Sequence, residues 1–165
     1  MLDRASFRRA LTAGLTAGVA MLYLCAVGLV EAFIEREVVT GYVTLGRVML
    51  FAPPLLVGYW IGGKVTGGSR QVLSGLVAGL AGGVLFAMGF LIATALSPGI
   101  REVLLRITPA LLSFIAFGLD PLPGAVLNVA VAAALGLIGA GSHALPARVR
   151  RPMAAGVGAV VLLSM

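Results

Sequence analysis

The chain has 165 residues, of which 60% are hydrophobic and 11% charged, and its mean hydropathy is +1.09. Because soluble domains carry about a quarter charged residues, this composition excludes a water-soluble globular protein and predicts an all-α, polytopic transmembrane helical bundle in contact with the lipid bilayer. The net charge of +6 comes from short basic clusters beside apolar segments. That pattern is typical of membrane topology and anionic-lipid contact, and it argues against nucleic-acid binding.

Three arginines precede the first apolar segment, residues 10–30. This segment is longer than the roughly 7 to 15 apolar residues of a signal-peptide core, so we predict a retained membrane span. The basic N-terminus predicts a cytoplasmic end, because Lys and Arg concentrate on the inner side of membrane proteins. Gly14 and Gly18, four residues apart, predict a face on which another helix packs closely.

A short acidic loop that includes Glu31 follows and is predicted to lie outside. The second span, residues 42–62, contains Arg47 about a turn and a half from its outer end. We expect the Arg47 side chain either to extend to the interface or to pair with an acidic residue of the loop, such as Glu31. The alternative is a functional site, since charged groups inside membrane spans often mark one.

A short basic hinge with Lys64 and Arg70 joins the second span to the third span, residues 72–96, and is predicted to be cytoplasmic. Glycines spaced four residues apart lie on one face of this third helix. They predict close contact with a second helix. These glycines are Gly75, Gly79 and Gly83.

The outer connection after the third span shows helical spacing of apolar residues over residues 101–118. Thr108 followed by Pro109 is typical of a helix start, and Gly118 of a helix end. We therefore predict an interfacial or re-entrant helix that is broken near Thr108, because the part after the break is too short to cross a bilayer.

The fourth span, residues 124–141, is rich in small residues, so we expect it to lie among other helices. Asn128 is its only strongly polar residue, and it predicts an interhelical hydrogen bond. The alternative is a position on a substrate path. A further apolar segment at residues 153–165 is too short to span, which predicts either the front part of a longer membrane protein or a half-inserted tail.

Motifs for enzymatic chemistry are missing from the sequence. It has no phosphate-binding GxxxxGK[ST] loop, no HExxH zinc motif and no cysteine pair. Cys25 lies in the middle of an apolar segment, and His143 has no acidic or cysteine neighbour in the sequence. We therefore expect no catalytic, cofactor-binding or metal site, and no enzymatic activity.

Two segments carry a resemblance to a known family. Residues 30–64 read VEAFIEREVVTGYVTLGRVMLFAPPLLVGYWIGGK, with an acidic loop after the first span. Residues 101–151 contain the stretch TPALLSF and end in a basic loop. Together these segments resemble the N-terminal membrane region of bacterial branched-chain amino acid ABC transporter permeases.

The resemblance implies a permease component, or its N-terminal part, in the bacterial inner membrane. Such a component would belong to an ATP-driven importer with a separate ATPase subunit, a solute-binding protein and other membrane helices as partners. The coupling loop and the substrate path of that family lie in a core outside the resembling segments, so no functional residue is carried over. The alternative is a non-transporting structural or assembly subunit of a larger membrane complex, which the small-residue faces fit equally well.

Overall fold

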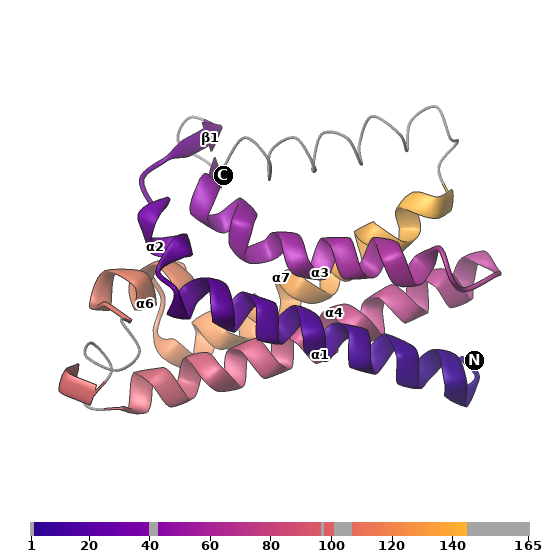
Figure 1. Cartoon of the computed structure of the whole chain (residues 1–165), viewed down its shortest axis with the longest axis horizontal. Helices are drawn as coiled ribbons and strands as arrows, with labels where there is room; N and C mark the ends of the chain where they lie inside the picture. Colours follow the sequence, from indigo (N-terminus) through magenta and orange to yellow (C-terminus); the bar gives the residue numbers. More distant parts are fainter. Residues whose placement is uncertain (1, 40–42, 97, 101–106, 145–165) are drawn as a thin grey trace.

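The computed structural model describes residues 2–39, 43–96, 98–100 and 107–144. These residues form a helical bundle with one short β-hairpin, which confirms the predicted all-α fold (Figure 1). Four helices of this described part are long and apolar enough to cross a membrane, so the chain is a membrane protein. They are α1 (Arg4–Ala26), α3 (Leu45–Gly62), α4 (Gly68–Ala95) and α7 (Pro121–Gly141).

The first span differs from the predicted range of residues 10–30. Helix α1 begins at Arg4, because the Asp3 carboxylate accepts a hydrogen bond from the backbone N–H of Ser6 and caps the helix. It ends at Ala26, because Gly28 has a left-handed φ of 75° that a continuing helix does not allow. A second short helix, α2 (Leu29–Ala32), follows this break.

The other predicted boundaries shift for similar local reasons. The second span begins at Leu45 instead of residue 42, because β1 (Glu37–Val39) and β2 (Val43–Thr44) form an antiparallel hairpin before it. Helix α4 covers Gly68–Ala95 and not residues 72–96, since the positive φ of Gly67 ends the hinge earlier. Helix α7 begins three positions before residue 124, because prolines fit the first helical turn.

The outer connection contains α6 (Pro109–Ile115), which starts at the predicted break. The Thr108 hydroxyl accepts the N–H of Leu111 at 3.1 Å and so caps the helix. Gly118 follows with a φ of 73°. The first part of the predicted interfacial helix, residues 101–106, and the predicted partial span at 153–165 lie outside the described residues. After α7 the described chain ends in a 3₁₀ turn, η1 (Ser142–Ala144).

Helix α4 packs against both α7 and α1, and α3 packs against α7 on another side of the bundle. In Figure 1 the N-terminus and the α3–α4 hinge lie at one end of the bundle, and α2 and α6 lie at the other. Along α4 the buried positions change from small to large. Gly75, Ala78 and Gly79 are buried near the hinge, and Phe86 and Phe90 are buried toward the other end. Along α4, close backbone contacts therefore lie near the hinge, and buried aromatic side chains lie toward the other end.

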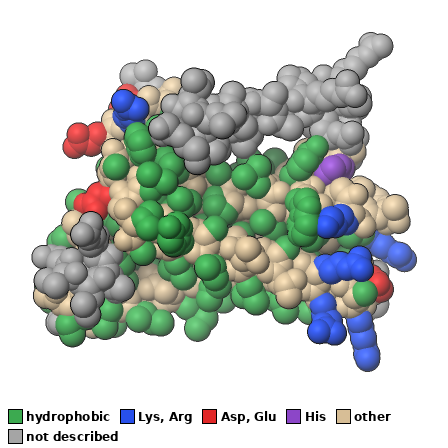
Figure 2. Space-filling model, viewed as in Figure 1, with side chains coloured by type: hydrophobic (Ala, Val, Ile, Leu, Met, Phe, Trp, Pro, Cys, Tyr) green, Lys and Arg blue, Asp and Glu red, His purple; other side chains and the backbone are tan. Residues whose placement is uncertain are grey.

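Most of the charged side chains in Figure 2 lie at the same two ends. We call the hinge end the basic end, because the start of α1 and the α3–α4 hinge carry Arg4, Arg8, Arg9, Lys64 and Arg70 beside the single carboxylate of Asp3. We call the opposite end the acidic end, because the segment from α2 to β1 carries Glu31, Glu35 and Glu37 beside the single cation Arg36. The surface between the two ends is mainly hydrophobic in this view, as a membrane-embedded belt requires.

Candidate functional site

Helix α6 is the element on which the three polar candidates Glu31, Arg47 and Asn128 converge. They come from α2, α3 and α7 and are far apart in the sequence. Each one contacts a different part of α6 or its flanking residues. The sequence alone placed Glu31 in the outer loop, Arg47 in the second span and Asn128 in the fourth span, and nothing in their spacing indicated that α6 contacts all three.

Glu31 holds the start of α6. Its Oε1 accepts a hydrogen bond from the Thr108 hydroxyl at 2.6 Å, and this hydroxyl oxygen also accepts the Leu111 N–H. One oxygen therefore caps α6 and joins it to α2. Charge-assisted hydrogen bonds of this length are among the stronger ones in proteins.

Arg47 lies in the first turn of α3 and faces the end of α6. Its guanidinium carbon is 5.2 Å from the ring centroid of Phe114 and 4.9 Å from that of Phe117. These distances fit cation–π contacts. Among the described residues the Nε of Arg47 is buried and has no hydrogen-bond partner. Arg47 thus contacts aromatic faces, and no ion pair joins it to Glu31 within the described part of the chain.

Phe117 carries backbone strain at this point. Its φ is 58°, in the left-handed region that a bulky L-residue enters at a cost of roughly 1 to 2 kcal/mol. Its ring lies 4.9 Å from the Arg47 guanidinium carbon and stacks on the Phe51 ring, with 6.0 Å between the ring centroids. These two contacts to α3 offset the strain and hold the segment that follows α6 against α3.

Asn128 of α7 is fully buried and holds α6 from the third side. Its Nδ2 donates to the carbonyl oxygen of Ile115 at 2.9 Å and to that of Gly124 at 2.8 Å. The first bond joins α7 to α6 and the second lies within α7. The Oδ1 atom has no partner among the described residues. Both donor hydrogens of Asn128 therefore serve the backbone.

The glycines proposed for helix packing lie at backbone contacts. A Cβ built on Gly14 would meet the backbone of Ala78, and one on Gly18 would meet that of Gly82, so both face α4 from α1. Gly75, Gly79 and Gly83 all face α7. Their nearest atoms there belong to residues 129–140. Helix α4 thus presents one small-residue face to α1 and another to α7.

Further glycines pack α3 against α7, and sequence reasoning missed them. A Cβ on Gly58 would meet the carbonyl of Gly136, and one on Gly139 would meet that of Leu55. Gly62 lies against Ala140 in the same way. The signal was present in the sequence, because Gly58 and Gly62 are four residues apart, a spacing that favours close helix contact.

His143 extends this contact at the basic end. Its ring stacks on that of Tyr59 at 4.5 Å, and its Nε2 is 2.7 Å from the Tyr59 carbonyl oxygen. No group of three or more His, Cys, Asp or Glu side chains in the described ranges could hold a metal ion. Comparison with protein families, curated proteins and solved structures finds no match to this chain. The function must therefore be inferred from the geometry of the described residues.

Proposed function

We propose that the bundle is the scaffold part of a membrane permease component, in an ATP-driven importer for branched-chain amino acids or similar small solutes. One observation carries this proposal: among the described residues, the buried polar side chains are Ser74 and Asn128, and both bond to backbone carbonyls. A solute path needs polar groups that are free to bind solute. In this interior the Ser74 hydroxyl bonds within α4, and the Asn128 amide nitrogen joins α7 to α6. Neither donor group is therefore free to bind a solute.

The type of complex is proposed from a resemblance. Residues 30–64 and 101–151 resemble the N-terminal region of branched-chain amino acid permeases. In this proposal the solute path and the coupling to a separate ATPase belong to other membrane helices, and a solute-binding protein delivers the substrate. The chain itself performs no enzymatic step.

Exposed apolar side chains give the scaffold two surfaces for lipid or partner helices. On α1, Val19 is 57% and Tyr23 is 65% exposed, and on α7, Leu122 and Val126 are each 67% exposed. In a membrane such side chains contact either acyl chains or other helices. The bundle can therefore join a larger assembly without opening its own core.

The charge distribution supports an orientation in the bacterial inner membrane. We propose that the basic end is cytoplasmic, with the N-terminus and the α3–α4 hinge on that side, because positive charge concentrates on the inner side. The acidic end with α2, the hairpin and α6 then faces outward. Helix α6 would lie on the side from which an imported solute arrives.

The test combines capture and uptake. The chain is tagged at its own locus, extracted in a gentle detergent, and its partners are identified by mass spectrometry. Uptake of radiolabelled leucine, isoleucine and valine is then compared in cells with and without the chain. We expect an ATPase with a phosphate-binding loop to co-purify and uptake to fall on deletion.

Complementation adds a matched pair of variants. Gly136→Leu should break the bundle at a backbone contact and fail to restore uptake. Gly141→Ala, where a Cβ meets no described atom within 4 Å, should restore it. Capture of a different membrane complex without an ATPase, together with unchanged uptake on deletion, would overturn the importer. It would favour the alternative, a structural or assembly subunit, which the close-packed interior fits as well.

A further inference from the structure

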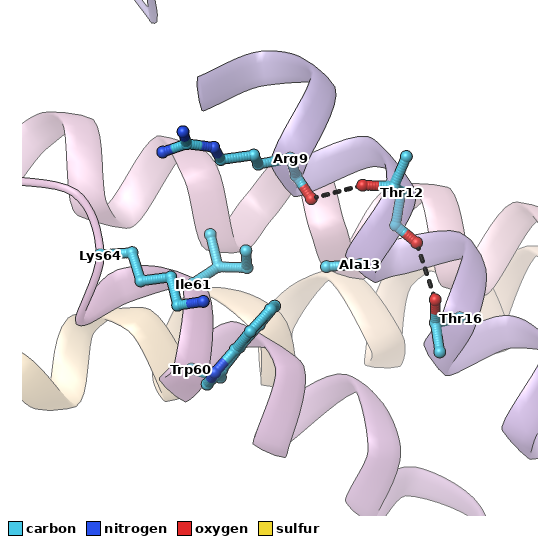
Figure 3. Close-up of a pocket in the computed structure, with 7 residues that line it drawn as sticks. All are labelled: Arg9, Thr12, Ala13, Thr16, Trp60, Ile61 and Lys64. Atoms are coloured by element: carbon cyan, nitrogen blue, oxygen red, sulfur yellow. Dashed lines mark hydrogen bonds between the residues drawn. The ribbon is translucent and has the colours of Figure 1, made fainter. Parts of the chain in front are cut away.

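A groove opens between α1 and α3 at the basic end of the bundle, with a volume of about 310 Å³ (Figure 3). Arg9 and Lys64 lie at one end of the groove, and Thr16 lies at the other. Arg9 belongs to α1, and Lys64 follows directly after α3. The groove therefore leads from the charged end of the molecule toward the middle of the α1 span.

The inner part of the groove is apolar in character, although two threonines line it. The Thr12 hydroxyl donates to the carbonyl oxygens of Arg8 and Arg9, at 3.0 and 3.1 Å, and the Thr16 hydroxyl donates to that of Thr12 at 3.0 Å. Their hydrogens are thus directed to the backbone of α1 (Figure 3). Ala13 and Ile61, both buried, complete this part of the wall. Such a wall suits hydrocarbon better than a polar ligand.

The mouth of the groove is cationic and aromatic. The Lys64 ammonium lies 3.5 Å from the ring centroid of Trp60, a cation–π contact that holds the charge at the opening. Trp60 is 54% exposed, as expected for an aromatic residue at the membrane interface. None of the described residues that line the groove is acidic. Within this part of the chain, the positive charge of Arg9 and Lys64 is therefore not neutralised in the groove.

We propose that this groove binds an anionic phospholipid, with the headgroup phosphate between Arg9 and Lys64 and an acyl chain along the α1 wall. Guanidinium and ammonium groups are the usual protein partners of phosphate oxygens. Thr12 and Thr16 lie about one and two turns beyond Arg9 on α1, so a chain that follows them runs into the bilayer. The occupant is a lipid and not a free phosphate, because the groove joins a cationic mouth to an apolar wall.

This proposal holds whether or not the chain serves an importer, because it needs only the bundle in a membrane. A lipid in this position would bridge α1 and the α3–α4 hinge from the cytoplasmic leaflet, where anionic lipids attract basic residues. Helix α1 packs less extensively against α3 than against α4, which it meets through glycines. The lipid would therefore also add contacts between α1 and α3.

Trp60 is the single tryptophan of the chain, so its fluorescence reports on this groove directly. The protein is placed in phosphatidylcholine vesicles that contain a small, fixed fraction of brominated lipid, either phosphatidylglycerol or phosphatidylcholine. Bromine quenches tryptophan on contact. The ratio of the two quenching constants gives the preference of the groove for the anionic headgroup. We expect the ratio to favour phosphatidylglycerol by about thirtyfold, from two cationic contacts near the surface.

The decisive variant is Arg9→Gln combined with Lys64→Gln, which should reduce the ratio to about one. Its matched control is Arg4→Gln combined with Arg70→Gln, which removes the same charge from the basic end outside the groove. This control should keep the preference. Because the ratio is formed within each protein, the change in tryptophan environment caused by losing Lys64 cancels.

Three results would overturn the proposal. Equal quenching by the two lipids in the wild-type protein would show that the groove does not select an anionic headgroup. An equal loss of preference in both double variants would show a general charge effect of this end of the molecule. Reversal of the quenching by soluble glycerol phosphate would show a site for small anions, in which the acyl chain plays no part.

Discussion

The backbones of Gly75 and Gly136 touch each other: a Cβ built on either glycine would meet the carbonyl oxygen of the other. The contact joins α4 to α7, and Gly58 of α3 approaches Gly136 as well. Three helices thus meet at one turn of α7. Lipid tails are as apolar as side chains, so close packing of this kind is a main source of helix association in membranes.

Replacing Gly136 with alanine should therefore destabilise the bundle. A methyl group at this position requires α4 and α7 to move apart, at a cost of about 1 to 3 kcal/mol for an overpacked core site. The matched control is Gly141→Ala at the end of the same helix, where a Cβ has no atom of the described residues within 4 Å. The control should change the free energy of unfolding by less than about 1 kcal/mol, the scale of helix propensity. Unfolding in mild detergent with added denaturant compares the two; equal stability would contradict the packing role.

The second prediction concerns the Thr108 hydroxyl at the start of α6. Thr108→Val keeps the shape of the side chain but removes the bond to Glu31 and the cap on Leu111. We expect a loss of about 0.5 to 2 kcal/mol, as for other N-cap residues. Hydrogen exchange at the Leu111 amide should become faster, and Thr108→Ser should restore protection because it keeps the hydroxyl. Faster exchange in the serine variant, at the rate of the valine variant, would show that the methyl group matters and the hydroxyl does not.

Arg47 and Phe117 form a pair that a double-mutant cycle can test. If the guanidinium stabilises α6 through the ring, Arg47→Met and Phe117→Leu should show a coupling energy of about 0.5 to 2 kcal/mol. The single variants alone cannot separate this coupling from lost packing, so the cycle is the appropriate measurement. Additive effects of the two substitutions would mean that the contact contributes nothing. They would also leave the stacking on Phe51 as the remaining ring contact that offsets the left-handed backbone at Phe117.

Local signals in the sequence predicted much of this fold. Composition and segment length predicted four membrane helices, and Thr108 with Pro109 predicted the start of α6. The exact ends of α1 and α4 depended on the Asp3 cap and on the backbone angles of Gly28 and Gly67, which no apolar pattern encodes. Hydropathy averages over a window, so it places a span without placing its caps.

The candidate site was harder to predict, because its parts are joined only by tertiary contacts. Arg47 was expected to reach the interface or an acidic residue, yet its guanidinium lies over Phe114 and Phe117, which are about 70 positions later in the chain. Aromatic rings give no charge signal in a sequence, so their role as partners for a cation becomes visible only when helices are packed. The bond between Glu31 and Thr108 is equally non-local.

Substitutions at Asn128 can distinguish a role in helix packing from a position on a solute path. Asn128→Asp replaces the donor with an acceptor that faces the Ile115 carbonyl, so it should destabilise the protein by more than the roughly 1 to 3 kcal/mol expected for Asn128→Ala. The control is Ser74→Ala at another buried polar site, where the hydroxyl donates to the Gln71 carbonyl oxygen within its own helix. It should have a small effect. A stable Asn128→Ala variant that loses uptake alone would point to solute contact instead of helix packing.

The proposed orientation predicts which residues can be labelled from each side of the membrane. Cys25 is the single cysteine and is 3% exposed, so the wild-type chain should resist a membrane-impermeant thiol reagent and serves as the control. Glu35 is exposed at the acidic end, so a cysteine introduced by Glu35→Cys should react in cells whose outer membrane is permeabilised and whose inner membrane is intact. A cysteine at Thr66, exposed in the α3–α4 hinge, should react only after the inner membrane is permeabilised. The reverse pattern would invert the bundle, and it would place the cationic groove between Arg9 and Lys64 in the outer leaflet.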